Sequence, residues 1–128
     1  MPYKMIDLFA GCGGLEDGFL QSGRYEDIAA VEWLRPQADT LILRLKTRWN
    51  ISDAEERVMC FDIQREQELF QGWNDTAKQP QAQVLPDGKK SRYKTGPYGS
   101  GRGLDYFVKQ ADGIDIIIGG PPCQAYSV

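Results

Sequence analysis

The sequence has no histidine, only three cysteines, and no apolar run near the roughly 20 residues that a membrane span needs. Without histidine, the chain cannot build a Ser-His or Cys-His nucleophile from its own residues. The cysteines include no Cys-x-x-Cys pair, which disfavours a disulfide framework and a zinc site and favours a reducing cytoplasm. The first residues lack the pattern of a signal peptide. We therefore expect a cytoplasmic protein without a bound metal or a membrane segment.

What the sequence does contain is typical of one globular domain. It has 128 residues, of which 41% are hydrophobic and 26% are charged, and its net charge is −3. Single domains commonly contain roughly 100–150 residues. A composition of this kind supports a packed core, so global disorder is excluded.

Charge is unevenly distributed along the chain. Residues 78–103 carry six basic side chains against one acidic side chain, whereas the segments on both sides are acidic. The same region is rich in glycine and proline and has few large aliphatic residues, so it cannot form a core of its own. We predict a mobile surface insertion at about residues 74–103. Its basic charge and tyrosines suit contact with nucleic-acid phosphates and bases, but a merely solvated loop is an equally good interpretation.

Apolar strands alternate with amphipathic helices in the rest of the chain. The pattern predicts strands at residues 4–10, 27–31, 57–61 and 114–118, and helices at residues 15–20, 36–49, 65–73 and 104–111. This alternation predicts an α/β fold with a parallel sheet and helices on its faces. Ligands of such sheets bind at the carboxyl ends of the strands, so residues that follow the strands are the candidates for a site.

Three of the predicted strands end in residues that suit an adenosine-bearing cofactor. The loop Gly11–Gly14 holds three glycines, which let the backbone approach a ligand closely at the start of a helix. Glu32 can accept hydrogen bonds from ribose hydroxyls, Trp33 can stack on an adenine, and Asp62 can bind an exocyclic amine. Taken singly, three of these features have simpler interpretations. The glycine loop could be only a tight turn, Trp33 could pack in the core, and Asp62 could be a helix N-cap. A nicotinamide dinucleotide site would explain the glycines and Glu32 but not the segment after the last strand.

That last segment is Gly119-Gly120-Pro121-Pro122-Cys123-Gln124. Together with Asp7–Gly14, Glu32-Trp33 and Asp62-Ile63, the run Gly120–Ser127 resembles the first four motifs of cytosine-C5 methyltransferases, in the same order. The resemblance covers nearly the whole chain outside the insertion. It implies a Rossmann-like fold that binds S-adenosylmethionine, with a parallel sheet that has helices on both faces.

The resemblance also implies a role for individual residues. Cys123 would be the catalytic nucleophile, adding to C6 of a cytosine that is flipped out of the duplex. Within the cofactor site, the glycine loop would surround the methionine part, Glu32 would hold the ribose, and Asp62 with Ile63 would bind the adenine edge. The residues implied to bind S-adenosylmethionine are Phe9, Gly11, Cys12, Gly13, Gly14, Glu32, Trp33, Asp62, Ile63 and Pro122.

The later motifs of that family are not found before Val128. We therefore expect residues 1–128 to be the N-terminal part of the catalytic domain, with an incomplete sheet and without the target-recognition region. The expected partners are double-stranded DNA, bound by the intact enzyme, and a C-terminal half supplied by the same or another chain. The implied setting is a bacterial restriction–modification system acting at the nucleoid. Two alternatives stay open: an inactive cofactor-binding or partner-binding fragment, and an RNA cytosine-C5 methyltransferase. On its own, the chain is expected to be inactive.

Overall fold

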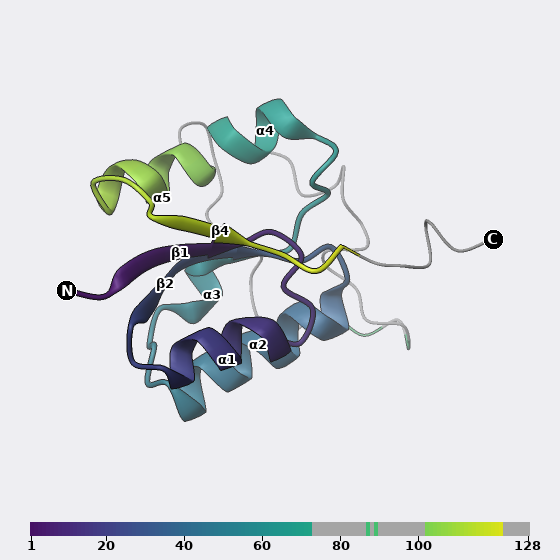
Figure 1. The fold of residues 1–128 in the computed structure, drawn as a ribbon. Coiled ribbons are helices and arrows are strands. Elements are labelled where there is room, and N and C mark those ends of the chain that lie inside the picture. Colours follow the sequence, from purple (N-terminus) through teal and green to yellow (C-terminus); the bar gives the residue numbers. More distant parts are fainter. Residues whose placement is uncertain (73–86, 88, 90–101, 122–128) are drawn as a thin grey trace.

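The computed structural model describes residues 1–72, 87, 89 and 102–121, which form an α/β unit (Figure 1). The strands are β1 (Tyr3–Asp7), β2 (Tyr25–Val31), β3 (Val58–Met59) and β4 (Ile116–Ile118). The helices are α1 (Gly14–Gln21), α2 (Arg35–Arg48), α3 (Ala54–Arg57), α4 (Glu66–Gln71) and α5 (Leu104–Gln110). The predicted basic insertion lies almost entirely outside the described residues. In the described ranges, no helix is long and apolar enough to cross a membrane.

The four strands form one parallel sheet in the order β3-β2-β1-β4. Strand β1 is therefore central, pairing with β2 on one side and with β4 on the other. The pairing of β1 with β2 is irregular, because Met5 pairs with Asp27 but Ile6 pairs with Ala29. Strand β4 is the edge opposite β3, and its Ile117 side chain is 62% exposed. The predicted α/β class with a parallel sheet is confirmed.

Helices cover both faces of the sheet, with α1 and α2 on one face and α4 and α5 on the other (Figure 1). Side chains alternate along each strand, so neighbouring residues of β1 enter different cores. Met5 belongs to the core under α1 and α2, with Leu41, Ile42 and Leu45 of α2. Ile6 belongs to the core under α4 and α5, with Leu69 and Leu104. Burial on both faces explains why apolar residues follow one another directly in these strands, as Met5 and Ile6 do.

Asp17 links α1 to the C-terminal end of α2. Trp49 Nε1 donates a hydrogen bond of 2.8 Å to Asp17 Oδ1, and Gln21 Nε2 donates one of 2.9 Å to Oδ2. Arg48 Nη1 lies 3.4 Å from the same Oδ2. Burial acts to raise the pKa of Asp17, but these two hydrogen bonds and the positive charge of Arg48 outweigh it and lower the pKa.

Most predicted elements are present, but the third strand is shorter than predicted. Strand β3 contains only Val58 and Met59 of the predicted residues 57–61. Arg57 instead ends α3, where its Nε lies 2.9 Å from Asp53 Oδ1 in the preceding turn. Its Nη1 also donates a hydrogen bond of 2.6 Å to the carbonyl oxygen of Asp27. These interactions favour a helical turn at a residue that the apolar pattern assigned to a strand.

Residue 103, at the approximate end of the predicted insertion, packs with the described unit. Gly103 is buried and precedes the first residue of α5. A Cβ atom at this position would lie 2.3 Å from the carbonyl oxygen of Leu69 and 2.4 Å from that of Phe70. Glycine is therefore needed here so that α5 can pack against α4, and Gly103 belongs to the packed unit.

Candidate cofactor site

A pocket of about 740 Å³ lies where the strands of the sheet end. Its lining includes one or more residues from the segment after each of the four strands. Six of the residues predicted to bind a cofactor line it: Phe9, Gly11, Glu32, Trp33, Asp62 and Ile63. Gly120, after β4, also lines the pocket. The parallel strands thus bring together residues that are far apart in sequence, at the edge where ligands of such sheets bind.

Two glycines shape the loop between β1 and α1. Gly11 has a φ of +57° and Gly13 a φ of +91°, both in the left-handed region that favours glycine. A Cβ atom on Gly13 would also lie 2.6 Å from Leu41 Cδ1, so the loop lies directly against α2. Cys12 is exposed between them, and Cys12, Gly13 and Gly14 are not among the residues that line the pocket. Gly13 and Gly14 form the start of α1 instead.

Glu32 connects this glycine loop to the turn between β2 and α2. The backbone N–H of Gly11 donates a hydrogen bond of 3.1 Å to Glu32 Oε1, and the N–H of Leu34 donates one of 2.9 Å to Oε2. Each carboxylate oxygen can accept about two hydrogen bonds, so the carboxylate still has capacity for hydroxyl donors of a ligand. Glu32 therefore fixes the shape of the pocket and offers acceptors to its interior.

Trp33 is not a core residue, because 46% of its surface is exposed and it lines the pocket. The simpler interpretation of Trp33 as core packing is thus wrong. An exposed indole at the wall of a mainly apolar pocket provides a flat surface on which a planar base can stack.

Asp62 lies after β3 and is not a helix N-cap. Its Oδ1 accepts a hydrogen bond of 2.9 Å from the backbone N–H of Gln64, two residues later, which is the geometry of an Asx turn. The N-cap of α4 is Arg65. The Asx turn holds the Asp62 carboxylate at the pocket wall, beside Ile63.

The sequence did not predict several other residues of the pocket wall, including Leu34, Gln37, Phe61 and Gln64. Leu34 and Gln37 lie at the beginning of α2, and their place depends on the direction in which α2 leaves the sheet. Phe61 and Gln64 flank Asp62 and Ile63, so proximity in sequence to a predicted pair was the signal that could have found them. Pro122 and Cys123 lie outside the described residues.

Three carboxyl groups are buried close together, one of them on α1 and the other two on β1 and β2. Asp7, Glu16 and Asp27 each have at most 1% of their surface exposed. Burial raises the pKa of Asp7 to about 6, and the negative charges of Asp27 and Glu32 add to this, whereas a hydrogen bond from the N–H of Phe9 acts to lower it. Burial also raises the pKa of Glu16 well above its ordinary value, with further contributions from Asp27. The periodicity of the sequence does not indicate that these three carboxyl groups meet.

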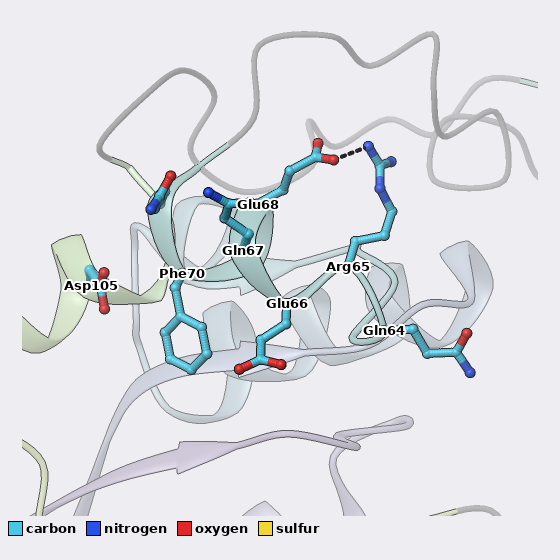
Figure 2. Close-up of a pocket in the computed structure, with 8 residues that line it drawn as sticks. Gln64, Arg65, Glu66, Gln67, Glu68, Phe70 and Asp105 are labelled. Carbon is cyan, nitrogen blue, oxygen red and sulfur yellow. Dashed lines mark hydrogen bonds and ion pairs between the residues drawn. The ribbon is translucent and has the colours of Figure 1, made fainter.

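A second hollow, of about 630 Å³, lies over α4 (Figure 2). Arg65 Nη2 pairs with Glu68 Oε1 at 2.5 Å at its rim, and Glu66 and Asp105 add two further acidic side chains. None of the predicted cofactor residues lines this hollow. Within the described ranges, no group of three or more histidine, cysteine or acidic side chains is arranged to hold a metal ion.

Comparison with known proteins identifies one family. The family model described as "C-5 cytosine-specific DNA methylase" matches residues 3–72. DNA (cytosine-5-)-methyltransferase M.ApeKI of Aeropyrum pernix is 32% identical over 98% of this chain and 20% of its own length. Type II methyltransferase M.HgiDI of Herpetosiphon aurantiacus is 57% identical over 29% of this chain and 12% of its own length. DNA (cytosine-5)-methyltransferase 1 of Gallus gallus is 25% identical over 97% of this chain and 6% of its own length. The matched regions thus cover a fifth or less of the length of each of these three relatives.

Proposed function

Because the chain belongs to the family of C-5 cytosine-specific DNA methylases, we propose that it forms the cofactor-binding part of a DNA (cytosine-5)-methyltransferase. The cofactor is S-adenosylmethionine, and the substrate of the intact protein is cytosine in double-stranded DNA. The names of its type II relatives support a role in restriction and modification. The observation that carries this proposal is the pocket at the strand ends, where six predicted residues from three separate motifs meet.

The residues of the pocket fit S-adenosylmethionine. The exposed indole of Trp33 offers a stacking surface for the adenine, and the Asp62 carboxylate at the wall offers an acceptor for its amino group. The remaining acceptor capacity of Glu32 suits the two ribose hydroxyls. Gly11, whose φ is positive, and Phe9, whose ring is exposed, line the part of the pocket that we assign to the methionine moiety. When bound, the cofactor supplies a methyl group carried on a positively charged sulfur.

Cys123 is proposed as the nucleophile that prepares the substrate. Carbon C5 of cytosine is a poor nucleophile in the aromatic ring. Addition of the Cys123 thiolate to C6 raises the electron density at C5, which would then bond to the methyl group that the cofactor supplies. Loss of the C5 proton would expel the thiolate and restore the ring. Cytosine must leave the helical stack to reach the thiol.

Cofactor binding can be tested by titration calorimetry with S-adenosylmethionine and S-adenosylhomocysteine. Trp33→Ala removes the stacking surface, which is worth about 1–3 kcal/mol per base, so affinity should fall roughly 5- to 150-fold. Leu43→Ala is the matched control, because Leu43 is 50% exposed on α2 and does not line the pocket. Its affinity should equal that of the wild type. Absence of binding to the wild type, or equal affinity in Trp33→Ala, would contradict the assigned site.

The covalent step can be tested with duplex DNA that carries 5-fluorocytosine, whose C5 has no proton to lose. In the presence of S-adenosylmethionine, the intact protein should form an adduct that survives denaturing electrophoresis, whereas Cys123→Ser should form none. The same duplex with ordinary cytosine is the control and should give no stable adduct. An adduct that persists in Cys123→Ser would rule out Cys123 as the nucleophile, and preference for transfer RNA over duplex DNA would assign the enzyme to RNA.

A further inference from the structure

Cys60 does not line the pocket, but its thiol contacts the backbone of Trp33, which does. It follows β3 directly, and only 1% of its surface is exposed. Its Sγ lies 3.3 Å from the carbonyl oxygen of Trp33, which is 27 residues away in sequence. The neighbouring carbonyl of Met59 accepts a hydrogen bond of 3.0 Å from the N–H of Glu32. Met59 and Cys60 therefore hold two consecutive residues of the turn between β2 and α2, Glu32 and Trp33.

This turn is short, and it carries two of the proposed cofactor contacts. Strand β2 ends at Val31 and α2 begins at Arg35, so the turn consists of Glu32, Trp33 and Leu34. The side chain of Glu32 and the backbone N–H of Leu34 are joined by the hydrogen bond described above. The contact from Cys60 fixes the remaining residue, Trp33, through its carbonyl oxygen. A rotation of this peptide would change the direction of the indole ring.

The state of the thiol suits a hydrogen-bond donor. Burial raises the pKa of Cys60 to about 12, the positive charge of Arg35 acts to lower it, and the negative charges of Glu32 and Asp39 act to raise it. Arg35 is itself buried and pairs with Asp39, its Nε lying 2.7 Å from Asp39 Oδ1. The thiol therefore keeps its proton at neutral pH and can donate it to the Trp33 carbonyl oxygen.

We propose that Cys60 is a positioning residue for the cofactor: its thiol holds the Trp33 carbonyl, so that the Trp33 ring and the Glu32 carboxylate face the pocket together. This inference rests on the proposed function, because the purpose of the positioning is adenosine binding. It assigns to a buried cysteine a role that is independent of the proposed nucleophile Cys123 and of the exposed Cys12.

Three substitutions separate the hydrogen bond from packing. Cys60→Ser keeps a donor at nearly the same position, Cys60→Val removes the donor without leaving a cavity, and Cys60→Ala removes both the donor and the packing volume. Each variant is first checked for folding by circular dichroism. Affinity for S-adenosylhomocysteine should fall about two- to fivefold in Cys60→Val and Cys60→Ala, because a thiol is a weak donor. Cys60→Ser should bind like the wild type.

A second measurement does not depend on any ligand. Hydrogen exchange of the backbone amides of Glu32 and Leu34 should be faster in Cys60→Val than in the wild type, and restored in Cys60→Ser. Equal loss in Cys60→Ser and Cys60→Val would show that packing alone matters and would overturn the proposal, as would wild-type exchange in Cys60→Val. If the wild-type protein binds no cofactor, the proposed function fails, and the exchange data alone decide whether Cys60 holds the turn.

Discussion

The buried carboxyl group of Asp7 should destabilise the folded protein at neutral pH. In the folded state its pKa is raised from 3.8 to about 6, chiefly by burial. The folded protein therefore binds the Asp7 proton more tightly than the unfolded chain does. As pH rises from about 4 to above 6, this difference in proton binding lowers the free energy of unfolding. Substitution of Asp7 by asparagine removes the titrating group and with it this loss.

The expected magnitude follows from the two pKa values. A pKa unit corresponds to about 1.4 kcal/mol, so a rise from 3.8 to about 6 corresponds to about 3 kcal/mol at a pH above both values. In Asp7→Asn the side-chain oxygen can keep the hydrogen bond of 3.3 Å from the N–H of Phe9. The new amide N–H₂ takes the place of Oδ2, which has no hydrogen-bond partner in the described structure. Because the amide must also be buried, we expect Asp7→Asn to be more stable than the wild type by about 1–3 kcal/mol at about pH 8.

Urea unfolding followed by circular dichroism at several pH values between about 4 and 8 would measure this difference. The gain in Asp7→Asn should be small near pH 4, grow through about pH 6 and then level off. Asp105→Asn, at an exposed position on α5, is the matched control and should change stability by less than about 0.5 kcal/mol at every pH. A stability difference that is the same at both ends of the pH range would refute the reasoning.

Two further predictions concern the loop and the helices that support the pocket. Gly13→Ala should destabilise the protein by about 1–3 kcal/mol in urea unfolding, because Gly13 has a positive φ and a Cβ atom there would approach Leu41. Gly18→Ala is the control, since Gly18 is a helical position with open space around it, and it should be neutral or slightly stabilising. Equal changes in stability in the two variants would contradict the argument. Asp17→Asn should cost about 1–2 kcal/mol at neutral pH, since the charged carboxylate accepts the Trp49 hydrogen bond. The lowered pKa of Asp17 means that this stabilisation is lost as pH falls through the folded pKa, so the cost should shrink on acidification; a cost that grows would contradict it.

Much of the fold and half of the site could be predicted from the sequence, because the signals are local. The apolar runs and the helical spacing of Leu41, Ile42 and Leu45 gave the order of elements and the parallel sheet. Parallel strands then required the residues after each strand to meet, which is why Glu32, Trp33 and Asp62 line one pocket.

The rest depends on contacts between distant residues. Nothing near Cys60 in the sequence indicates that its thiol meets the Trp33 carbonyl, and nothing near Asp7 indicates that Glu16 and Asp27 are buried beside it. The start of β3 could not be predicted either, since Arg57 ends α3 and its guanidinium binds the Asp53 carboxylate and the Asp27 carbonyl oxygen. Hydrogen bonds and ion pairs of this kind are set by the packing of elements, not by periodicity.

The position of β4 at the edge of the sheet has a consequence for how the isolated chain behaves in solution. Among the described residues no further strand pairs with β4, and a short strand of three isoleucines with an exposed Ile117 is a template for intermolecular strand pairing. Pairing there would cover an apolar side chain and satisfy backbone groups at once. In the described structure this edge runs along the side of the sheet, whereas the pocket lies at the strand ends. Self-association at this edge would depend directly on protein concentration, and it would occur two residues before Gly120, which lines the pocket.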